Sequence, residues 1–176
     1  MQPAPKPHPG PIIVMGVSGS GKSTAGRAIA EKLGVPFLEG DAFHPAANVE
    51  KMRQGIPLTD EDRWPWLARV ARELKAAARE KGGAIVSCSA LRRIYRDRLR
   101  AAVGPELRFV FLDGDKATLS PRMRHRQGHF MPASLLESQF ATLEKPRGEE
   151  DVLTVNVAGP IEDVIAAAMQ ALSERR

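Results

Sequence analysis

Five short apolar runs are spaced along the chain, and longer stretches with a helical repeat of apolar residues separate them. The first run contains β-branched residues and ends in a glycine, which is typical of a buried strand, and the other four runs are similarly short. The predicted strands are residues 11–16, 35–41, 84–88, 107–114 and 152–159.

Four stretches between and after these runs are predicted to be helices. Apolar residues at helical spacing occur in three of them, after Thr24, from Trp64 onward and from Leu91 onward, and each stretch ends at a glycine. Pro160 opens the fourth helix. The residues expected to face the core of this last helix are Ile161, Val164, Ile165, Ala168 and Leu172.

The alternation of strands and helices predicts an α/β fold with a parallel sheet covered on both faces. Ligands bind such sheets beyond the carboxyl ends of the strands, so candidate chemistry is sought directly after each apolar run. Residues 12–176 are expected to form one domain. Residues 1–11 have a proline at every second position from Pro3 to Pro11, which indicates an extended, disordered tail without the apolar centre of a signal peptide.

Composition places the chain among ordinary soluble globular proteins. Of its 176 residues, 43% are hydrophobic and 27% are charged. The apolar runs are too short to span a bilayer, so no membrane association is expected. Cys88 is the only cysteine, which excludes an intrachain disulfide and fits a cytoplasmic location.

A net charge of +5 and a pI near 9.7 permit anionic partners. The positive residues gather in residues 92–100 and 122–129. Three interpretations stay open for them, namely contact with nucleic acid, a solvated helix face, or a site for phosphates or a small acid.

The strongest motif follows the first strand and matches G-x-x-x-x-G-K-[ST]. In this position, between a strand and a helix, its backbone N–H groups can cradle the phosphates of ATP. Lys22 is expected to reach the β- and γ-phosphates, and the Ser23 hydroxyl to ligate Mg²⁺. A mere glycine-rich turn is the alternative. The predicted nucleotide-binding residues are Gly16, Val17, Ser18, Gly19, Ser20, Gly21, Lys22, Ser23 and Thr24.

Asp41 follows the second strand and would project toward the same edge of the sheet. It can accept a proton from a substrate hydroxyl or orient the waters of Mg²⁺, and a cap of the next helix or turn is the alternative. The third strand ends in serine and cysteine instead of a metal-binding aspartate. Mg²⁺ is therefore expected on Ser23, the phosphates and water, with Asp41 in the outer shell. Ser89 is a candidate substrate contact, whereas Cys88 is interpreted as a buried filler.

Two arginines after the fourth strand, Arg122 and Arg126, stand four residues apart and share one helix face. Two guanidinium groups there suit the charge of a transferring phosphoryl group, so both are predicted to be catalytic together with Lys22 and Asp41. Ordinary surface arginines are the alternative. The helix should break at Gly128, and "GHFMP" is typical of the tip of a flap that closes to exclude water.

Four segments of the chain resemble the gluconate kinases of the P-loop small-molecule kinases. They are "GVSGSGKS", "GDAFHPAANVEKMRQGIPLTDEDRWPWL", "SCSALRRIYRDRLR" and "GHFMPASLLESQFATLEKP", and the likeness runs from about Ile12 to Ala168. The resemblance implies transfer of the ATP γ-phosphoryl group to the 6-hydroxyl of D-gluconate. It also implies a five-stranded parallel sheet with a helical lid at about residues 115–145, a homodimer, and a place in the pentose phosphate or Entner–Doudoroff pathway.

The resemblance also suggests how a polyol with a carboxylate at its far end would be bound. Arg63, Lys51 and Arg96 compete for that carboxylate, and the sequence does not choose among them. The tryptophans of "WPW" are expected to pack the base of a helix and not to touch substrate. The substrate-binding candidates are Asp41, His44, Asn48, Lys51, Asp62, Arg63, Ser89 and Arg96, with His129 and Gln139 closing from the lid.

Two rival functions are considered. Within the kinases, the acceptor could be another sugar acid. From a different class, the chain could be a nucleotide-dependent nucleic-acid-binding protein, for which the arginine clusters are the only support. The sequence lacks a recognisable recognition helix and is only 5% aromatic, so no nucleic-acid partner is expected.

Overall fold

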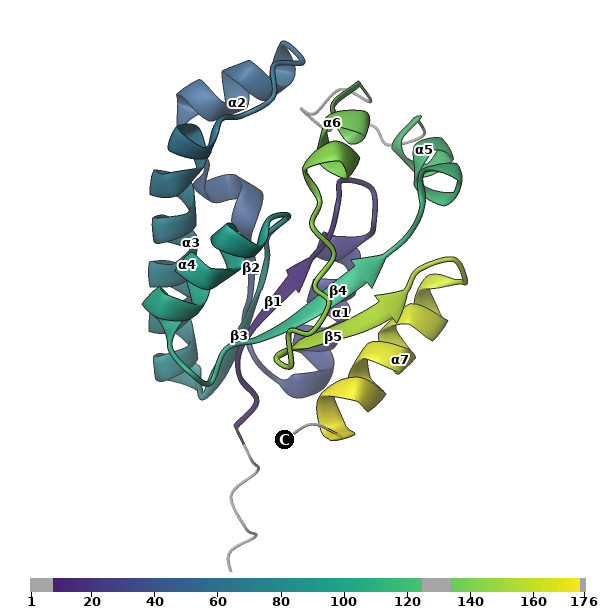
Figure 1. Ribbon diagram of the computed structural model, residues 1–176. Coiled ribbons are helices and arrows are strands. Elements are labelled where there is room, and N and C mark those ends of the chain that lie inside the picture. Colours follow the sequence, from purple (N-terminus) through teal and green to yellow (C-terminus); the bar gives the residue numbers. More distant parts are fainter. Residues whose placement is uncertain (1–7, 125–133, 175–176) are drawn as a thin grey trace, which may run out of the picture.

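The structure is a computed structural model that describes residues 8–124 and 134–174. Its centre is a five-stranded sheet in the order β2-β3-β1-β4-β5, and all neighbouring strands pair in parallel (Figure 1). The predicted α/β class with a five-stranded parallel sheet is confirmed. The strands are β1 (Gly10–Met15), β2 (Phe37–Glu39), β3 (Gly83–Ser87), β4 (Arg108–Asp113) and β5 (Val152–Asn156).

Helices cover both faces of this sheet. The long helix α3 and its neighbour α4 pack on one face, whereas α1 and α7 pack on the other (Figure 1). The helices are α1 (Lys22–Leu33), α2 (Ala46–Arg53), α3 (Asp60–Lys81), α4 (Arg93–Val103), α5 (Lys116–Arg124), α6 (Ser134–Thr142) and α7 (Ile161–Glu174), with a 3₁₀ helix η1 (Gly40–Phe43) after β2.

Alternation along β1 divides the core into two layers. Ile12 and Val14 belong to the cluster under α1 and α7, and Ile13 and Met15 to the cluster under α3 and α4. All four side chains are fully buried, so the central strand is apolar on both faces, as expected for a parallel sheet. This packing holds the carboxyl ends of the strands, and the loops that leave them, in one place.

Some strands and helices begin or end at other residues than the apolar pattern predicts, because local contacts determine those ends. Gly10, predicted to lie in the tail, already belongs to β1 and pairs with Gly83, and Pro11, the first residue of the predicted strand, pairs with Ala84. β2 is shorter than predicted, because the chain turns into η1 at Gly40. In α7, Ile161 is 36% exposed and does not face the core, because it begins the helix beside the loop after β1.

Helix α3 begins at Asp60, earlier than the first residue of its predicted apolar face. Thr59 and Asp62 form a reciprocal capping box, in which the Asp62 N–H donates to Thr59 Oγ1 (3.1 Å) and the Thr59 N–H donates to Asp62 Oδ2 (2.9 Å). Pro65 lies inside the helix near this end. The cap therefore fixes the orientation of the start of α3, which carries Arg63.

The polar segment after β2 has no apolar period in the sequence but is ordered by contacts with β3 and α3. A Cβ atom on Gly40 would lie 1.8 Å from the Ser87 carbonyl oxygen, so only glycine allows this close approach. The Gly40 N–H donates to Ser87 Oγ (3.2 Å), and its carbonyl accepts from Trp66 Nε1 (2.8 Å). These contacts place Asp41 just beyond the carboxyl ends of β2 and β3.

Among the described residues, no helix combines the length and the apolar character needed to cross a membrane.

Candidate active site

The loop between β1 and α1 has the shape expected of a phosphate cradle. Gly21, the residue before α1, has φ 92°, and Gly16 has φ 147° with the Leu112 carbonyl oxygen 2.9 Å from where a Cβ would lie. The backbone can curl here because both positions are glycine. The N–H groups of the first turn of α1 are therefore available to an anion.

Lys22 and Ser23 start α1 at this loop. The Lys22 ammonium donates to the carbonyl oxygens of Gly16 (3.0 Å) and Val17 (3.1 Å). The Ser23 hydroxyl donates to Glu39 Oε2 (2.6 Å), and the other oxygen of Glu39 accepts from Ser87 Oγ (2.6 Å). Glu39 thus joins the ends of β2 and β3 to the cradle.

Glu39 is not among the residues predicted from the sequence. A metal-binding acid was expected at the end of the third strand, where Ser87 and Cys88 stand instead. In the folded chain, the carboxylate comes from the neighbouring strand and reaches across to the Ser87 hydroxyl. The signal was present as an acidic residue ending an apolar run, two positions before Asp41.

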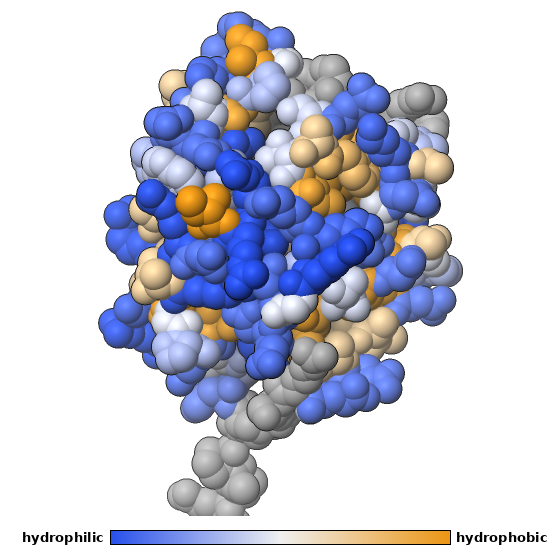
Figure 2. Space-filling view, in the orientation of Figure 1, coloured by the Kyte–Doolittle hydropathy of each residue, from blue (hydrophilic) through white to orange (hydrophobic). Residues whose placement is uncertain are grey.

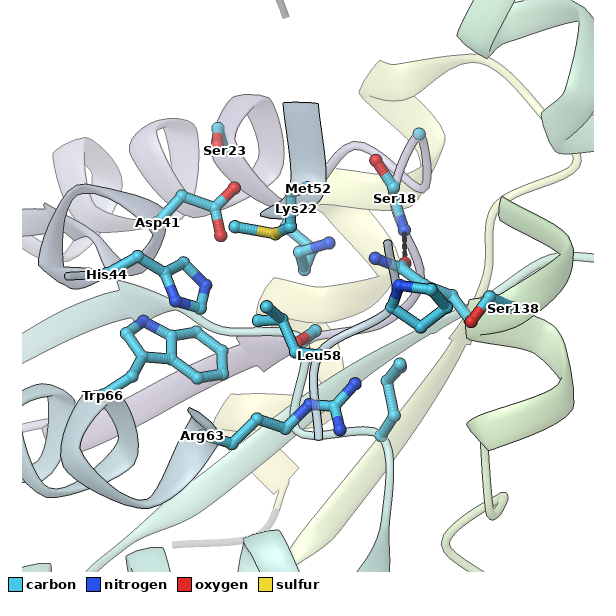
Figure 3. Close-up of a pocket in the computed structure, with 15 residues that line it drawn as sticks. Ser18, Lys22, Ser23, Asp41, His44, Met52, Leu58, Arg63, Trp66 and Ser138 are labelled. Atoms are coloured by element: carbon cyan, nitrogen blue, oxygen red, sulfur yellow. Dashed lines mark hydrogen bonds between the residues drawn. The ribbon is translucent and has the colours of Figure 1, made fainter. Parts of the chain in front are cut away.

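One pocket lies beside the cradle (Figure 3). Residues from the β1–α1 loop, η1, α2, α3, the β3–α4 loop and α6 surround it. The lining residues are Ser18, Gly19, Lys22, Ser23, Asp41, His44, Met52, Pro57, Leu58, Arg63, Trp66, Ser89, Leu91, Ser138 and Gln139.

Asp41 and Lys22 face this same pocket (Figure 3). Their charges also act in opposite directions on one buried group, the thiol of Cys88. The pKa of Cys88 is raised to about 12, mainly by burial, and among the smaller influences the negative charge of Asp41 raises it and the positive charge of Lys22 lowers it. The carboxylate and the ammonium therefore converge on one region. The thiol stays protonated and does not act as a nucleophile.

His44 is held against an aromatic wall of the pocket. Its imidazole stacks on the Trp66 indole with ring centroids 4.0 Å apart and planes 16° apart. Burial, followed by the positive charge of Arg63, lowers the pKa of His44 to about 4, so the ring is neutral at neutral pH. Trp66, expected only to pack a helix base, also lines the pocket.

Of the three cations that compete for a substrate carboxylate, Arg63 alone lines the pocket. Its guanidinium donates to the Tyr95 hydroxyl (2.9 Å) and stacks over the Tyr95 ring. The Tyr95 hydroxyl in turn donates to Asp60, and Arg92 donates to the other oxygen of that carboxylate (2.9 Å). Arg63 is thus oriented by fixed neighbours and keeps one edge toward the pocket (Figure 3).

Lys51, Asp62 and Asn48 stand behind the pocket instead of lining it. The Lys51 ammonium is paired with Asp62 Oδ2 (2.7 Å), and the same carboxylate caps α3. Asn48 is 3% exposed and bridges His44 and the backbone of Asp62. These three residues were predicted to contact the substrate directly, and their geometry does not favour such contact.

Arg96 requires a correction. It is fully buried, and its guanidinium donates to both oxygens of Glu149 (2.9 and 2.8 Å). Its remaining bonds go to the backbone carbonyls of Ala90, Leu91 and Glu144. Every guanidinium nitrogen already has a partner inside the protein, so Arg96 is a structural residue and not a ligand for a substrate carboxylate.

The predicted lid residues divide into three groups. Arg122 donates to the Val157 carbonyl (2.9 Å) and lines a smaller depression on the outer side of the cradle, together with Thr24. Gln139 of α6 lines the main pocket, and its side-chain oxygen accepts from the Ser18 N–H (2.6 Å). Arg126 and His129 lie outside the described residues.

The arginine cluster of α4 lies on a face where hydrophilic residues predominate (Figure 2). Most of its arginines are paired with carboxylates, whereas Arg98 stacks over the Trp64 ring. Arg92 pairs with Asp60 and Glu144, and Arg100 pairs with Asp97, Glu149 and Asp151. This pairing favours the interpretation of a salt-bridged helix face.

Comparison with known proteins decides the family. The gluconokinase of Gluconobacter oxydans (strain 621H) is 51% identical over 145 residues, which cover 82% of this chain and 81% of that protein. The chain belongs to the gluconokinase family. The thermosensitive gluconokinase of Escherichia coli (strain K12) is 44% identical over 162 residues, 92% of this chain and 86% of that protein.

Solved structures and family models agree with this membership. The crystal structure of a gluconokinase from Sinorhizobium meliloti 1021 superposes with a TM-score of 0.86 at 53% identity, covering 96% of this chain and 94% of that one. The sequence model of a family described as an AAA domain matches residues 12–146, which include the cradle, the pocket and α6.

Proposed function

We propose that this protein catalyses ATP-dependent phosphorylation of D-gluconate at the 6-hydroxyl, giving 6-phospho-D-gluconate. The observation that carries the proposal is one pocket shared by two sets of groups in a chain of the gluconokinase family. Lys22 and Ser23 of the phosphate cradle form one side, and Asp41, His44 and Arg63 form the other.

The charges of Lys22, in the cradle, and Asp41, beside it, suit in-line phosphoryl transfer. Asp41 would accept the proton of the attacking hydroxyl, and Lys22 would offset the charge that develops on the phosphoryl oxygens. Arg122, on the outer side of the cradle, and Arg126 are proposed to add to this stabilisation. Positioning and electrostatic stabilisation supply most of the rate in this chemistry.

Arg63 is the proposed partner of the gluconate carboxylate. It lines the pocket, whereas Lys51 is neutralised by Asp62 and Arg96 by Glu149. The Tyr95 hydroxyl and the Asp60 carboxylate hold the guanidinium in place, so little side-chain entropy would be lost when a carboxylate binds.

Ser23 and Glu39 are the residues proposed to hold Mg²⁺. Their three oxygens are the hard ligands that Mg²⁺ prefers, and this ion usually takes only one or two protein groups in addition to phosphates and water. Bound there, Mg²⁺ would neutralise charge on the β- and γ-phosphates. Glu39, which contacts Ser23 directly, therefore replaces Asp41 as the carboxylate proposed to lie beside Mg²⁺. Asp41 is left to accept the proton of the substrate hydroxyl.

The region of residues 115–145 is proposed to act as a lid. Two of its helices, α5 and α6, stand at the carboxyl edge of the sheet, and the bond from Ser18 to Gln139 joins α6 to the cradle (Figure 1). Closure would exclude water, which competes with the substrate hydroxyl. We further propose that the protein acts in the cytoplasm as a homodimer and that its product enters the pentose phosphate pathway.

A coupled ADP-release assay with one acceptor at a time tests the function. D-gluconate should support turnover, whereas other aldonates, keto-gluconates and D-glucitol should have much lower kcat/KM. A higher kcat/KM for another sugar acid would replace gluconate as the substrate. D-glucitol, in which an alcohol replaces the carboxylate, also tests Arg63. Arg63→Met should lose most of the parent enzyme's preference for gluconate over D-glucitol, and an unchanged preference would remove Arg63 from carboxylate binding.

A further inference from the structure

Asn48 contacts His44 but does not itself line the pocket. It belongs to the first turn of α2 and is 3% exposed. Its side-chain nitrogen Nδ2 donates to the Asp62 carbonyl (2.9 Å) and is 3.2 Å from His44 Nδ1. A buried carboxamide is thus shared between the backbone of α3 and one nitrogen of the imidazole.

The Asp62 carbonyl determines which way the carboxamide faces. A carbonyl oxygen only accepts hydrogen bonds, so the Asn48 atom facing it must be the NH₂ group. The same NH₂ group faces His44 Nδ1 and has a second N–H to give. A proton on Nδ1 would set two N–H groups against each other, so Nδ1 must be the accepting nitrogen of the ring.

The other ring nitrogen faces a different environment. The stack on Trp66 fixes the plane of the imidazole, and Figure 3 shows an edge of the ring directed into the pocket. A neutral imidazole carries one proton, and Nδ1 does not hold it. The ring is neutral because burial and the charge of Arg63 lower the pKa of His44 to about 4. Nε2 therefore carries an N–H.

We propose that Asn48 is a positioning residue that sets the tautomer of His44, so that the ring gives its Nε2–H to a hydroxyl oxygen of a polyol substrate. In the same pocket, the Asp41 carboxylate would accept a hydrogen bond from one substrate hydroxyl and His44 would donate one to another. The pocket would therefore orient the substrate by requiring one hydroxyl to donate and another to accept. The identity of the polyol rests on the proposed function, whereas the tautomer does not.

Nuclear magnetic resonance of the full chain labelled with ¹⁵N-histidine tests the tautomer without substrate. Long-range proton–nitrogen spectra at neutral pH should show His44 Nδ1 unprotonated and Nε2 protonated, with His44→Gln used to assign the signals. A proton on Nδ1, or on both nitrogens, would overturn the inference. This result is independent of the ADP-release assay, so failure of gluconate as a substrate and failure of the tautomer assignment are distinguishable.

Asn48→Asp tests the consequence for substrate binding. The new carboxylate would accept from Nδ1–H and raise the pKa of His44, so the neutral ring of the variant would present a lone pair at Nε2. The charged groups that line the pocket with this ring are Lys22, Asp41 and Arg63, and the Lys51–Asp62 pair lies beyond Asn48. These neighbours stay the same in the variant.

The gluconate KM of Asn48→Asp should be close to the parent value at low pH, where both ring nitrogens carry protons. It should rise about fivefold or more once the ring loses a proton, since one hydrogen bond is lost. The parent enzyme should lack this rise, and so should Gln170→Glu, the same amide-to-acid change on the exposed face of α7. Equal pH profiles for Asn48→Asp and the parent would contradict the inference.

His44→Gln and His44→Leu keep the test decisive if Asn48→Asp does not fold. A glutamine amide can still donate near the Nε2 position, whereas leucine cannot. His44→Gln should therefore have a smaller increase in gluconate KM than His44→Leu, and equal increases would show that no hydrogen bond from this position reaches the substrate.

Discussion

Replacement of Arg96 by methionine is expected to destabilise the protein and to leave gluconate affinity nearly unchanged. Arg96 is fully buried, and the side chain of its partner Glu149 is only 3% exposed. In the variant, Glu149 would keep only Arg100 as an ionic partner (2.7 Å). The carbonyl groups of Ala90 and Glu144 would lose their bond from the guanidinium, whereas the Leu91 carbonyl would still accept from the Glu144 N–H (2.8 Å). The cost should come mostly from these groups left buried without a partner.

The magnitude follows from measured losses at buried ion pairs. Removing one partner costs about 3–5 kcal/mol when the remaining charge is left uncompensated, and because Glu149 keeps Arg100, the cost for Arg96→Met should lie toward the lower end of this range. In a chain of this length, each kcal/mol lowers Tm by about 2–4 °C, so the melting temperature should fall by roughly 6–20 °C. The double variant Arg96→Met/Glu149→Leu removes both charges and should lose less stability than the sum of the single variants.

Urea unfolding and thermal melts measure the stability, and steady-state kinetics on the folded variants measure the gluconate KM. Arg93→Met is the matched control, since Arg93 lies in the same helix with a side chain 63% exposed and only a 3.9 Å contact to Asp97. Its effect should stay within about 0.5 kcal/mol. An Arg96→Met enzyme that melts like the parent but has a tenfold higher gluconate KM would refute this reasoning and return Arg96 to the substrate site.

Three further predictions concern the pocket and the cradle beside it. Asp41→Asn should lower turnover by roughly 10²–10⁴ with little change in the ATP KM, whereas turnover within about threefold of the parent value would exclude Asp41 as the base. Glu39→Gln should raise the Mg²⁺ concentration that gives half-maximal activity, because it removes a charge beside Ser23; an unchanged Mg²⁺ titration would argue against Glu39 in the metal site. The pKa of His44 is about 4 in the folded protein, against an ordinary value of 6.5. The unfolded chain therefore binds a proton more readily between these values, and the free energy of unfolding should fall as pH is lowered through this window. His44→Gln should lack that part of the fall in urea titrations, and identical pH dependence in the two proteins would rule out a low pKa at His44.

Local sequence signals determined most of the architecture. The period of apolar residues predicts each strand and the helices on both faces, because burial of an apolar run or stripe is the main driving force of folding. The cradle is also readable locally, since its glycines, Lys22 and Ser23 are consecutive in the chain and each has a role fixed by its own chemistry. The position of Asp41 at the pocket was also predictable, because ligands bind at the carboxyl ends of parallel strands.

Only the tertiary structure decided which polar residues work together. Arg63 and Arg96 are both arginines within the segments that carry the resemblance, but Arg63 reaches the pocket and Arg96 is enclosed by Glu149 and three carbonyl groups. Glu39 contacts Ser23 and Ser87 because β2 and β3 are neighbours, and Asn48 contacts His44 with a side chain that also donates to the Asp62 carbonyl. A hydrogen bond depends on distances of a few tenths of an ångström between residues far apart in the chain, and apolar periodicity, which records only the face a residue occupies, does not contain that information.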